Sequence, residues 1–388
     1  MRIKRIIKRV EYTFRRAYWR SKYTKSHQKE LVSFSNAIGI KLSKQKGEDL
    51  FLNKWRRLYP NVNVDFYRFY SHFIGNDANI VPDDVFHIII EPTLNSQTAL
   101  QVYSDKNMFE KLFDSSLFPT CVLRKMEGDF MDKDYRLLHM DDKLFFTMVI
   151  NNQHLVQKGR LIVKPSVETG GGAGVRLFIY NGNTWISDDG KELSMSLLNR
   201  LYKNNFIIQE CIEPSEFVKQ FNPTSYSTLR IFTYRSVKDD VPHFIGGYLR
   251  VGAIGSFKDN IWGGGYACPI NEDGTLAEYA GDSSRRKYDS INGVLLRNKT
   301  FKIPNWDRVL EVVYRVALTN TPNRLLSFDV MLNADNIPFI IEFNVKHQTV
   351  TTVQTLQHAF FGEYTDEIID YCIIRKDKIC YSSLVRNV

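Results

Sequence analysis

The sequence predicts an α+β protein of two or three domains. Its 388 residues exceed the size of a typical domain, which is about 100–150 residues. Paired apolar segments at 227–236 and 243–252, and again within 325–344, predict antiparallel strands. Residues 306–321 repeat apolar side chains at helical spacing and predict an amphipathic helix beside those strands.

The net charge of +9 is concentrated at the N-terminus, because residues 1–30 hold 11 Lys or Arg and only two Asp or Glu. The rest of the chain is close to neutral, which excludes a protein that coats nucleic acid with its whole surface. The hydrophobic content of 43% excludes a disordered chain.

The first 20 residues have the pattern of an amphipathic helix with a basic polar face. Tyr18 and Trp19 follow the apolar stripe, and such rings favour the headgroup region of a membrane. This pattern is typical of a helix that lies on anionic lipid. The alternative is a surface helix that packs on the protein's own core. Nucleic acid is not expected as a partner. The apolar stripe consists of Ile3, Ile6, Ile7, Val10, Phe14 and Ala17.

The cysteines and the start of the chain indicate the compartment. Five cysteines without a CxxC pair fit reduced thiols better than disulfides or a zinc site. No apolar run reaches the roughly 20 residues that span a bilayer, and charges interrupt the first 20 residues, unlike in a signal peptide. We therefore expect a cytoplasmic protein, peripheral at the inner face of the membrane if residues 1–20 bind lipid.

Residues 31–105 are expected to form a mixed α/β region. The segment 27–59 reads as helical with one break near Gly47. Residues 85–90 read as a buried strand that ends before Pro92. Another helix is expected to start with Ser104 or Asp105 as its N-cap. The aromatic residues expected in the core of this region are Phe66, Tyr67, Phe69, Tyr70 and Phe73.

The hairpin at 325–344 carries acidic residues among apolar neighbours. Glu342 and Asn344 are two residues apart, so they project from one face of a strand, and the turn brings Asp329 back toward Glu342. Converging carboxylates repel each other and lose hydration unless a cation joins them. Oxygen ligands of this kind suit Mg²⁺ held together with substrate phosphates. The alternative is a pair of solvated acids.

A glycine run follows the strand expected at 160–165. Lys164 ends this strand, Gly170, Gly171 and Gly172 follow it, and a second strand is expected at 175–180. Glycines let backbone N–H groups approach phosphate oxygens, and a lysine adds positive charge. Because a strand follows and no Gly-Lys-Ser/Thr closes the loop, this is neither a Walker A loop nor a Rossmann turn. The alternative is a flexible hairpin tip.

Taken in chain order, these segments resemble the ATP-grasp superfamily over about residues 100–350. The matching motifs are SDK, LIVKPSVETGGGAGV, IIQECI, TLRIFT, FDV and IIEFN. Residues 217–233, 249–265 and 328–344 resemble the sugar-transfer-associated branch, which is found with bacterial polysaccharide genes. The resemblance implies two α+β subdomains whose antiparallel sheets clamp ATP. The expected divisions are a basic arm at 1–30, the region 31–105, a glycine-loop subdomain at 106–210, a metal-hairpin subdomain at 211–360 and a tail at 361–388.

The resemblance also implies roles for single residues. Lys164 and Arg230 are the expected catalytic residues, with Arg230 facing the transferred phosphate or the acyl phosphate. The expected ATP-binding residues are Lys106, Lys164, Gly170, Gly171, Gly172, Glu210, Cys211, Ile212 and Glu216. The expected magnesium ligands are Asp329, Glu342 and Asn344.

The acceptor side follows the family pattern less closely. Ser227 stands where relatives have Asn, and VKHQTV follows IIEFN where many have a Pro-Gly turn. His347 in that segment is either a substrate-orienting or a structural histidine. The residues expected to line the acceptor pocket are Arg250, Asp259, Asn260 and His347.

The function implied by the resemblance is that of an ATP- and Mg²⁺-dependent carboxylate–amine ligase that acts through an acyl phosphate. The expected substrate is a small molecule or glycan, either a cell-surface polysaccharide precursor or an amino acid or sugar acceptor. Two alternatives stay open: a phosphotransferase that acts on a sugar hydroxyl, and a non-catalytic module that binds an anionic membrane.

Overall fold

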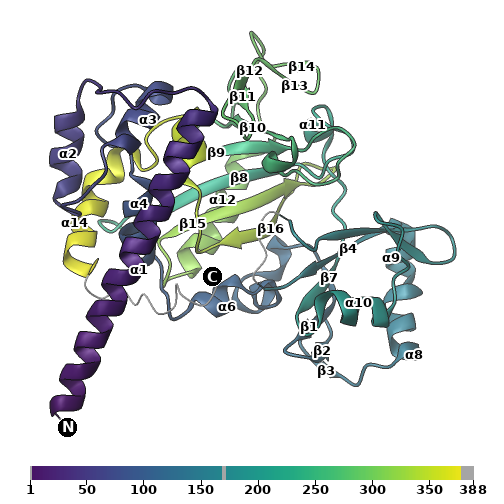
Figure 1. The fold of residues 1–388 in the computed structure, drawn as a ribbon. Helices are drawn as coiled ribbons and strands as arrows, with labels where there is room; N and C mark the ends of the chain where they lie inside the picture. The colour runs from purple at the N-terminus through teal and green to yellow at the C-terminus, as the bar shows by residue number, and fades with distance from the viewer. Residues whose placement is uncertain (1, 168–171, 377–388) are drawn as a thin grey trace.

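The computed structural model describes residues 2–167 and 172–376, with side chains from residue 17 onward except that of Trp19. The described residues form an N-terminal helical part and two seven-stranded sheets (Figure 1). Neighbouring strands in both sheets run antiparallel. The predicted α+β class is therefore confirmed.

The first sheet has the strand order β3-β2-β1-β7-β4-β5-β6. The predicted glycine-loop hairpin is its β4–β5 pair, and β7 lies between β1 and β4. Short helices cover one face and bury Phe145, Leu155 and Leu198 against the sheet. The strands are β1 (Cys121–Met126), β2 (Asp129–Met131), β3 (Leu137–Leu138), β4 (Arg160–Pro165), β5 (Arg176–Tyr180), β6 (Trp185–Ser187) and β7 (Phe206–Glu210), and the helices are α8 (Asp142–Phe145), η4 (Phe146–Ile150), α9 (Gln153–Lys158) and α10 (Met195–Tyr202).

The second sheet has the strand order β12-β11-β10-β9-β8-β15-β16. Both hairpins predicted from the sequence are present, as β8–β9 and β15–β16. The strands are β8 (Thr228–Arg235), β9 (Pro242–Val251), β10 (Tyr266–Pro269), β11 (Ala280–Gly281), β12 (Lys287–Tyr288), β15 (Leu325–Leu332) and β16 (Pro338–Asn344), and a separate pair is β13 (Ser290–Ile291) with β14 (Val294–Leu295).

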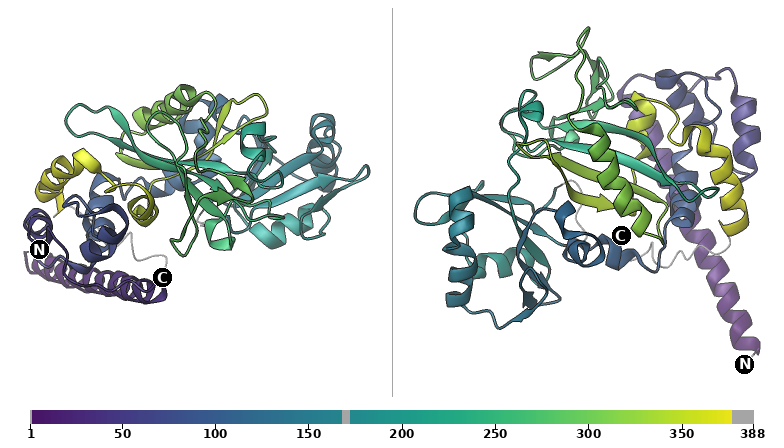
Figure 2. Two further views of the ribbon diagram at one scale, coloured as in Figure 1. Left: turned by 90° about the horizontal axis from the view of Figure 1, so that it is seen from above. Right: turned by 180° about the vertical axis from the view of Figure 1, so that it is seen from behind.

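Helices cover both faces of the second sheet (Figure 2). The predicted amphipathic helix is α12 (Trp306–Thr319), and its buried valines pack on one face with Ile231 and Phe328. The other face packs against α13 (Val350–Leu356) and the N-terminal helices, through Phe232 and Leu325. The alternation along β8 therefore sends neighbouring side chains into two different cores.

The N-terminal part consists of helices and one isolated bridge at Asn95. The break predicted near Gly47 is present, although it already begins after Ala37. Asp105, one of the two predicted N-caps, caps the helical turn at 106–108. Its side chain accepts a hydrogen bond from the Asn107 N–H. The helices are α1 (Arg2–Ala37), α2 (Glu48–Arg56), α3 (Asp65–Ile74), α4 (Asp83–Val85), η1 (Phe86–Ile90), α5 (Glu91–Leu94), α6 (Leu100–Ser104), η2 (Lys106–Met108), α7 (Phe109–Leu112) and η3 (Ser115–Leu117).

The strand expected at 85–90 is wrong, because α4, η1 and α5 form one continuous helical segment. Its middle is a π-helical turn in which the Glu91 N–H donates to the Phe86 carbonyl. Pro92 has no N–H to donate, and the wider turn before it accommodates this loss within the helix. A mixed α/β region at 31–105 is therefore wrong as well.

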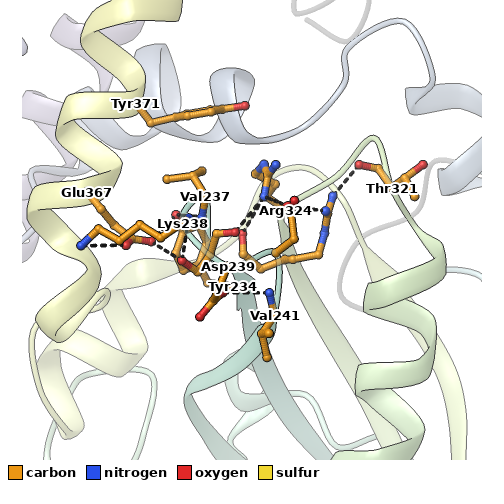
Figure 3. A network of polar contacts seen from close by, with 12 residues as sticks. Tyr234, Val237, Lys238, Asp239, Val241, Thr321, Arg324, Glu367 and Tyr371 are labelled. Carbon is orange, nitrogen blue, oxygen red and sulfur yellow. Dashed lines mark hydrogen bonds and ion pairs between the residues drawn. The ribbon is translucent and has the colours of Figure 1, made fainter.

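The segment expected to be a C-terminal tail contains η6 (Gly362–Tyr364) and α14 (Thr365–Arg375). Ile368 and Ile369 of α14 are buried in the same core as the N-terminal helices. Glu367 accepts hydrogen bonds from Tyr234 and Ser236 and pairs with Lys238 at the β8–β9 turn (Figure 3). The residues up to 375 are thus part of the folded body.

The first half of α1 extends away from the other elements, whereas its second half packs on α3 and α4 (Figures 1 and 2). Leu31 and Ser35 of the second half are buried. The apolar stripe predicted between Ile3 and Phe14 lies outside the described side chains. Among the described residues, no helix combines the length and apolarity needed to cross a bilayer.

Candidate functional site

Three adjacent strands of the second sheet place the charged residues Arg230, Asp329 and Glu342 side by side, and we call these three residues the row. Strand register sets Arg230 of β8 opposite Asp329 of β15, and Asp329 opposite Glu342 of β16. The Arg230 guanidinium binds Asp329 with two hydrogen bonds, 2.5 Å from Nε to Oδ1 and 2.9 Å from Nη2 to Oδ2. Arg250 of β9 donates to the same carboxylate at 3.1 Å. The paired acids predicted from the sequence therefore do lie side by side.

A β-bulge in β16 shapes this row. Asp329 pairs with Glu342, but the next residue of β15, Val330, pairs with Ile340, so that Ile341 has no opposite residue. The Ile341 carbonyl accepts a hydrogen bond from Lys164 Nζ at 3.0 Å. Bulges free a backbone group and re-aim neighbouring side chains. Here the bulge joins the first sheet to the second through Lys164.

Two lysines bring positive charge to the row. Lys106 Nζ lies 3.2 Å from Glu342 Oε2, and Lys106 and Lys164 are both buried. Burial, and then the nearby charge of Lys106, lowers the pKa of Lys164 to about 8. Burial opposes the ionisation of Asp329, but Arg230 and Arg250 outweigh it and hold the pKa of Asp329 below its usual value. Each carboxylate of the row is thus paired with at least one positively charged side chain.

One cavity, which we call cavity A, opens between the two sheets on the β4 side of the row. It has a volume of about 180 Å³ and contains the predicted ATP-side residues Lys164, Gly172 and Glu210. Gly170 and Gly171 lie outside the described residues. The other predicted residues that line cavity A are Cys211, Ile212, Asp329, Glu342, Arg230, Arg250, Asp259 and Asn260.

Three predicted ATP-binding residues are placed differently from expectation, and the first is Lys106, which does not line cavity A. Glu216 lines neither cavity A nor the neighbouring cavity described next; its side chain is 87% exposed and pairs with Lys219. Glu210 lines cavity A, but His154 Nε2 lies 2.8 Å from its Oε1, so the carboxylate already has a partner. Burial raises the pKa of Cys211 to about 11, which keeps it a thiol and agrees with its expected role as a backbone position.

A second cavity, cavity B, lies on the other side of the row. It has a volume of about 360 Å³ and contains Arg250, Asn260 and His347, three of the predicted acceptor residues, together with Asn344 and Lys106. The fourth acceptor residue, Asp259, lines cavity A instead, where it pairs with Arg250 at 3.0 Å and accepts from Thr228. Cavities A and B share Arg230, Arg250, Asn260 and Glu342.

The loop at 252–265 lies over the boundary between the cavities. A Cβ on Gly252 would collide with the Lys258 carbonyl oxygen. A Cβ on Gly265 would lie 2.5 Å from the Val251 carbonyl oxygen. These contacts explain part of the glycine-rich motif, because only glycine lets the loop close on itself. The loop presents Trp262, with 68% of its surface exposed, at cavity B.

Sequence reasoning missed several residues of cavity B. Tyr248 faces the row from β9, and its place follows only from the register that sets it opposite Arg230. Trp262 stands in a motif whose loop shape could not be read from the sequence. The other missed residues that line cavity B include Ser104, Ile261, Lys346, Thr349 and Thr352.

The chemistry of the row fits a Mg²⁺ ion in part. Asp329 and Glu342 are neighbouring hard-oxygen ligands whose charge is now balanced by arginine and lysine. Asn344 lines only cavity B, whereas Asp329 lines only cavity A, so Glu342 is the one expected magnesium ligand that lines both cavities. No group of three or more His, Cys, Asp or Glu arranged to hold a metal exists among the described residues. Substrate oxygens would have to complete the coordination.

One family model matches most of the chain. The family model for sugar-transfer associated ATP-grasp proteins matches residues 89–364. No curated protein sequence matches the chain. Similar solved structures include the D-alanine–D-alanine ligase of Bacillus anthracis, with 14% identity over 71% of this chain and 68% of that one and a TM-score of 0.36.

Two further structures have similarly low sequence identity. The ATP-grasp ligase PsnB, solved with a precursor variant, Mg and ADP, shares 13% identity over 72% of this chain and 61% of its own, with a TM-score of 0.38. The N5-carboxyaminoimidazole synthase of Aspergillus clavatus shares 10% identity over 70% of this chain and 53% of its own, with a TM-score of 0.37. The chain thus spans less than two thirds of the length of either protein.

Proposed function

Because the chain belongs to the sugar-transfer associated ATP-grasp family, we propose that it uses ATP and Mg²⁺ to join a carboxylate to an amine through an acyl phosphate. The observation that carries this proposal is the charged row between the two cavities. Arg230 and Glu342 line both cavities, so a phosphate in cavity A and an acceptor in cavity B would meet at these side chains.

Cavity A suits the nucleotide. Lys164 places an ammonium group in cavity A, and Gly172 contributes backbone to its lining. Lys106 lines cavity B and adds its charge through Glu342, which lines both cavities. Cavity A also contains the apolar side chains of Ile162, Met331 and Ile341, which can pack on a flat ring. ATP bound with its phosphates directed toward the row would place its adenine ring against these apolar side chains and its phosphates against Lys164.

The charged side chains would then promote two steps by positioning and electrostatics. The acceptor carboxylate attacks the γ-phosphorus, the bond to the bridging oxygen breaks, and ADP leaves with the electron pair. The amine, in its uncharged form, then attacks the acyl carbon, and its C–N bond forms as the C–O bond to phosphate breaks. The proton that the nitrogen loses in this step ends on the departing phosphate. Arg230, Lys106 and Lys164 would balance the negative charge in both steps. Mg²⁺ held by Asp329 and Glu342 would add further charge neutralisation.

The carbohydrate part of the proposal is supported by the family description alone, which names sugar transfer. We propose a carboxylated or amino sugar, or an amino acid joined to one, as a substrate in making cell-surface polysaccharide. The extended first half of α1 supports a further proposal, binding to anionic lipid at the inner face of the membrane (Figure 2).

A product assay tests the reaction class. Purified protein is incubated with Mg·ATP and pairs of uronic acids and amino acids or amino sugars, and ADP and free phosphate are measured separately. A ligase releases both products in equal amounts, and only when the carboxylate and the amine are both present. ADP without free phosphate would instead establish a phosphotransferase. Neither product with any pair would support the non-catalytic alternative.

The matched variants for this assay are Glu342→Gln and Glu213→Gln. Glu342 lies in the row, whereas Glu213 forms exposed ion pairs with Arg160 and Lys219. We expect Glu342→Gln to raise the magnesium concentration needed for half-maximal ADP formation by about tenfold or more. Glu213→Gln should leave it unchanged. An unchanged magnesium requirement in Glu342→Gln would reject Glu342 as a ligand.

A further inference from the structure

A third cavity, which we call the α1 chamber, lies between α1 and the helical segment 83–94. Its volume is about 380 Å³, and every side chain that lines it carries a polar group. Residues 23–87 of this wall precede residue 89, where the family match begins. Six of the eleven lining residues therefore lie outside the family match. The residues that line it are Tyr23, Ser26, His27, Glu30, Asp83, His87, Glu91, His347, Gln348, Thr349 and Thr351.

The α1 chamber adjoins cavity B. His347 and Thr349 line both spaces, and both residues are exposed rather than packed into the core. His347 has a φ of 55°, a left-handed conformation that is uncommon for a residue with a side chain. This conformation ends the extended path of β16 and turns the chain into the segment between the two spaces. A ligand in the chamber would therefore border the acceptor side of the row.

The two spaces carry opposite charge. Cavity B contains Lys106, Arg230, Arg250 and Lys346 against the single carboxylate of Glu342. The chamber contains three carboxylates and no Lys or Arg among its lining residues. A carboxylate-bearing substrate is thus favoured in cavity B, and a cation is favoured in the chamber.

Two of the three chamber carboxylates retain acceptor capacity. Glu30 lies on the exposed side of α1, 3.6 Å from His27 Nδ1. Glu91 accepts from the Gln348 N–H with one oxygen and faces His87 with the other, which leaves lone pairs unused. Asp83 is half-buried and already accepts from Tyr70 and Thr351, so it holds the wall together.

One residue of the chamber wall also has an unsatisfied buried acceptor. Gln348 is 1% exposed and lines the chamber, and its Nε2 donates to two backbone carbonyls. Its Oε1 has no hydrogen-bond partner among the described residues. A buried amide oxygen without a donor costs free energy. An ammonium or amine N–H bound beside it would remove that cost.

We propose that the α1 chamber is the binding site for the amine-bearing co-substrate, which it holds through an ammonium group. The inference rests on the proposed ligase function, because only that reaction needs an amine next to a carboxylate site. His27 supports it: burial lowers the pKa of His27 to about 4, so its ring is neutral and can accept a hydrogen bond from the ammonium group. Burial opposes the charging of His87, but Glu91 and Asp83 outweigh it and raise the pKa of His87, so this ring offsets only part of the negative charge of the three carboxylates.

Histidine-ring NMR on the full-length protein tests this proposal without requiring the natural substrate. The probes are three matched pairs: methylammonium and methanol, ethanolamine and ethane-1,2-diol, and D-glucosamine and D-glucose. We expect the ammonium member of each pair to shift the ring signals of His27, His87 and His347 in a saturable way. His139 and His243, which line none of the three cavities, should not respond. An equal response to the neutral members would overturn the proposal, as would no saturable shift with any ammonium probe.

Two variants localise the binding. Ser26→Trp, on the chamber side of α1, should abolish the shifts by filling the space, whereas Ser33→Trp on an exposed position of the same helix should not. Glu30→Gln should weaken binding about two- to fivefold, as expected for one exposed ion pair. Probe binding that is unchanged in Ser26→Trp places the amine elsewhere.

The two proposals can fail separately. If ammonium probes bind in the chamber but no carboxylate and amine pair yields ADP and phosphate, the ligase function is wrong and the chamber is only a cation site. If the ligase reaction is found and its KM for the amine is the same in Ser26→Trp and Ser33→Trp, the chamber assignment is wrong and the ligase function stands.

Discussion

Lys164 is a single residue whose ionisation should be visible in the kinetics. Its pKa is lowered to about 8, mainly by burial. A lysine is charged below its pKa, so the attraction for phosphate weakens as the pH rises through that value. We expect kcat/KM for ATP, which reports the free enzyme, to fall above about pH 8.

The variant Lys164→Arg should move this fall to higher pH, because a guanidinium stays protonated. Lys191→Arg is the matched control, since Lys191 is exposed and pairs with Asp189. A fall at the same pH in Lys164→Arg would assign it to another group. The non-ionising Lys164→Met should lose nearly all ADP formation while it keeps the volume of the side chain.

Asp329 should matter for stability as well as for chemistry. Its removal in Asp329→Ala leaves Arg230 and Arg250 without their shared acceptor inside the protein. Breaking a buried pair from one side costs about 3–5 kcal/mol. Asp366→Ala breaks exposed pairs with Lys54 and Arg57 and should cost at most about 1 kcal/mol. Denaturant unfolding measures both values, and equal losses would contradict the buried-pair interpretation.

Single residues were predicted well where a motif fixed both their type and their spacing. The two-residue spacing of Glu342 and Asn344 and the hairpin turn brought Asp329 opposite Glu342, as the structure has it. The bulge at Ile341 was not predictable, and neither was the placement of Asp329 and Asn344 in different cavities. The exposure of Glu216 depends on the fold of the turn after β7, which local sequence does not determine.

Elements were predicted where a polar face or a turn marks them. The helix α12 has a buried and an exposed face, so its period is readable, whereas β15 is buried along its whole length and was predicted from the turn that pairs it with β16. The segment 85–90 is buried on every side, with Phe86 and Ile89 at 0% exposure. Without a polar face, an apolar run does not reveal whether its period is that of a strand or a helix. The structure of this segment was therefore decided by its packing against the rest of the protein and not by its local sequence.

The helix α14 is attached to the second sheet by a polar network at the β8–β9 turn (Figure 3). Glu367 accepts from the buried hydroxyl of Tyr234 at 2.8 Å and from Ser236 at 2.9 Å. We expect Glu367→Ala to destabilise the protein by about 1–3 kcal/mol, because Tyr234 is left without an acceptor. Lys238→Ala removes only an exposed partner and should change stability by less than about 1 kcal/mol. Thermal unfolding of both variants measures the difference.

At the scale of the whole molecule, the proposed binding of the first half of α1 to anionic lipid can be tested directly. A chain lacking residues 1–20 should lose sedimentation with anionic vesicles, because it lacks eight Lys or Arg and the apolar stripe. Salt should weaken binding of the full chain to these vesicles, since surface charge is screened over about 8 Å at physiological ionic strength. Neutral vesicles are the control. Equal sedimentation of the two chains would show that the helix does not bind lipid.

The helix α1 is unbroken from Arg2 to Ala37, so its two halves share one axis. A helix that binds in a membrane interface lies parallel to the membrane surface. Its second half, which forms the wall of the α1 chamber, would then run along that surface too. A helix with its side chains is about 10–12 Å thick, which places the chamber within roughly that depth of the headgroups. An amine displayed on a lipid headgroup could thus enter from the side, with its acyl chains still in the bilayer.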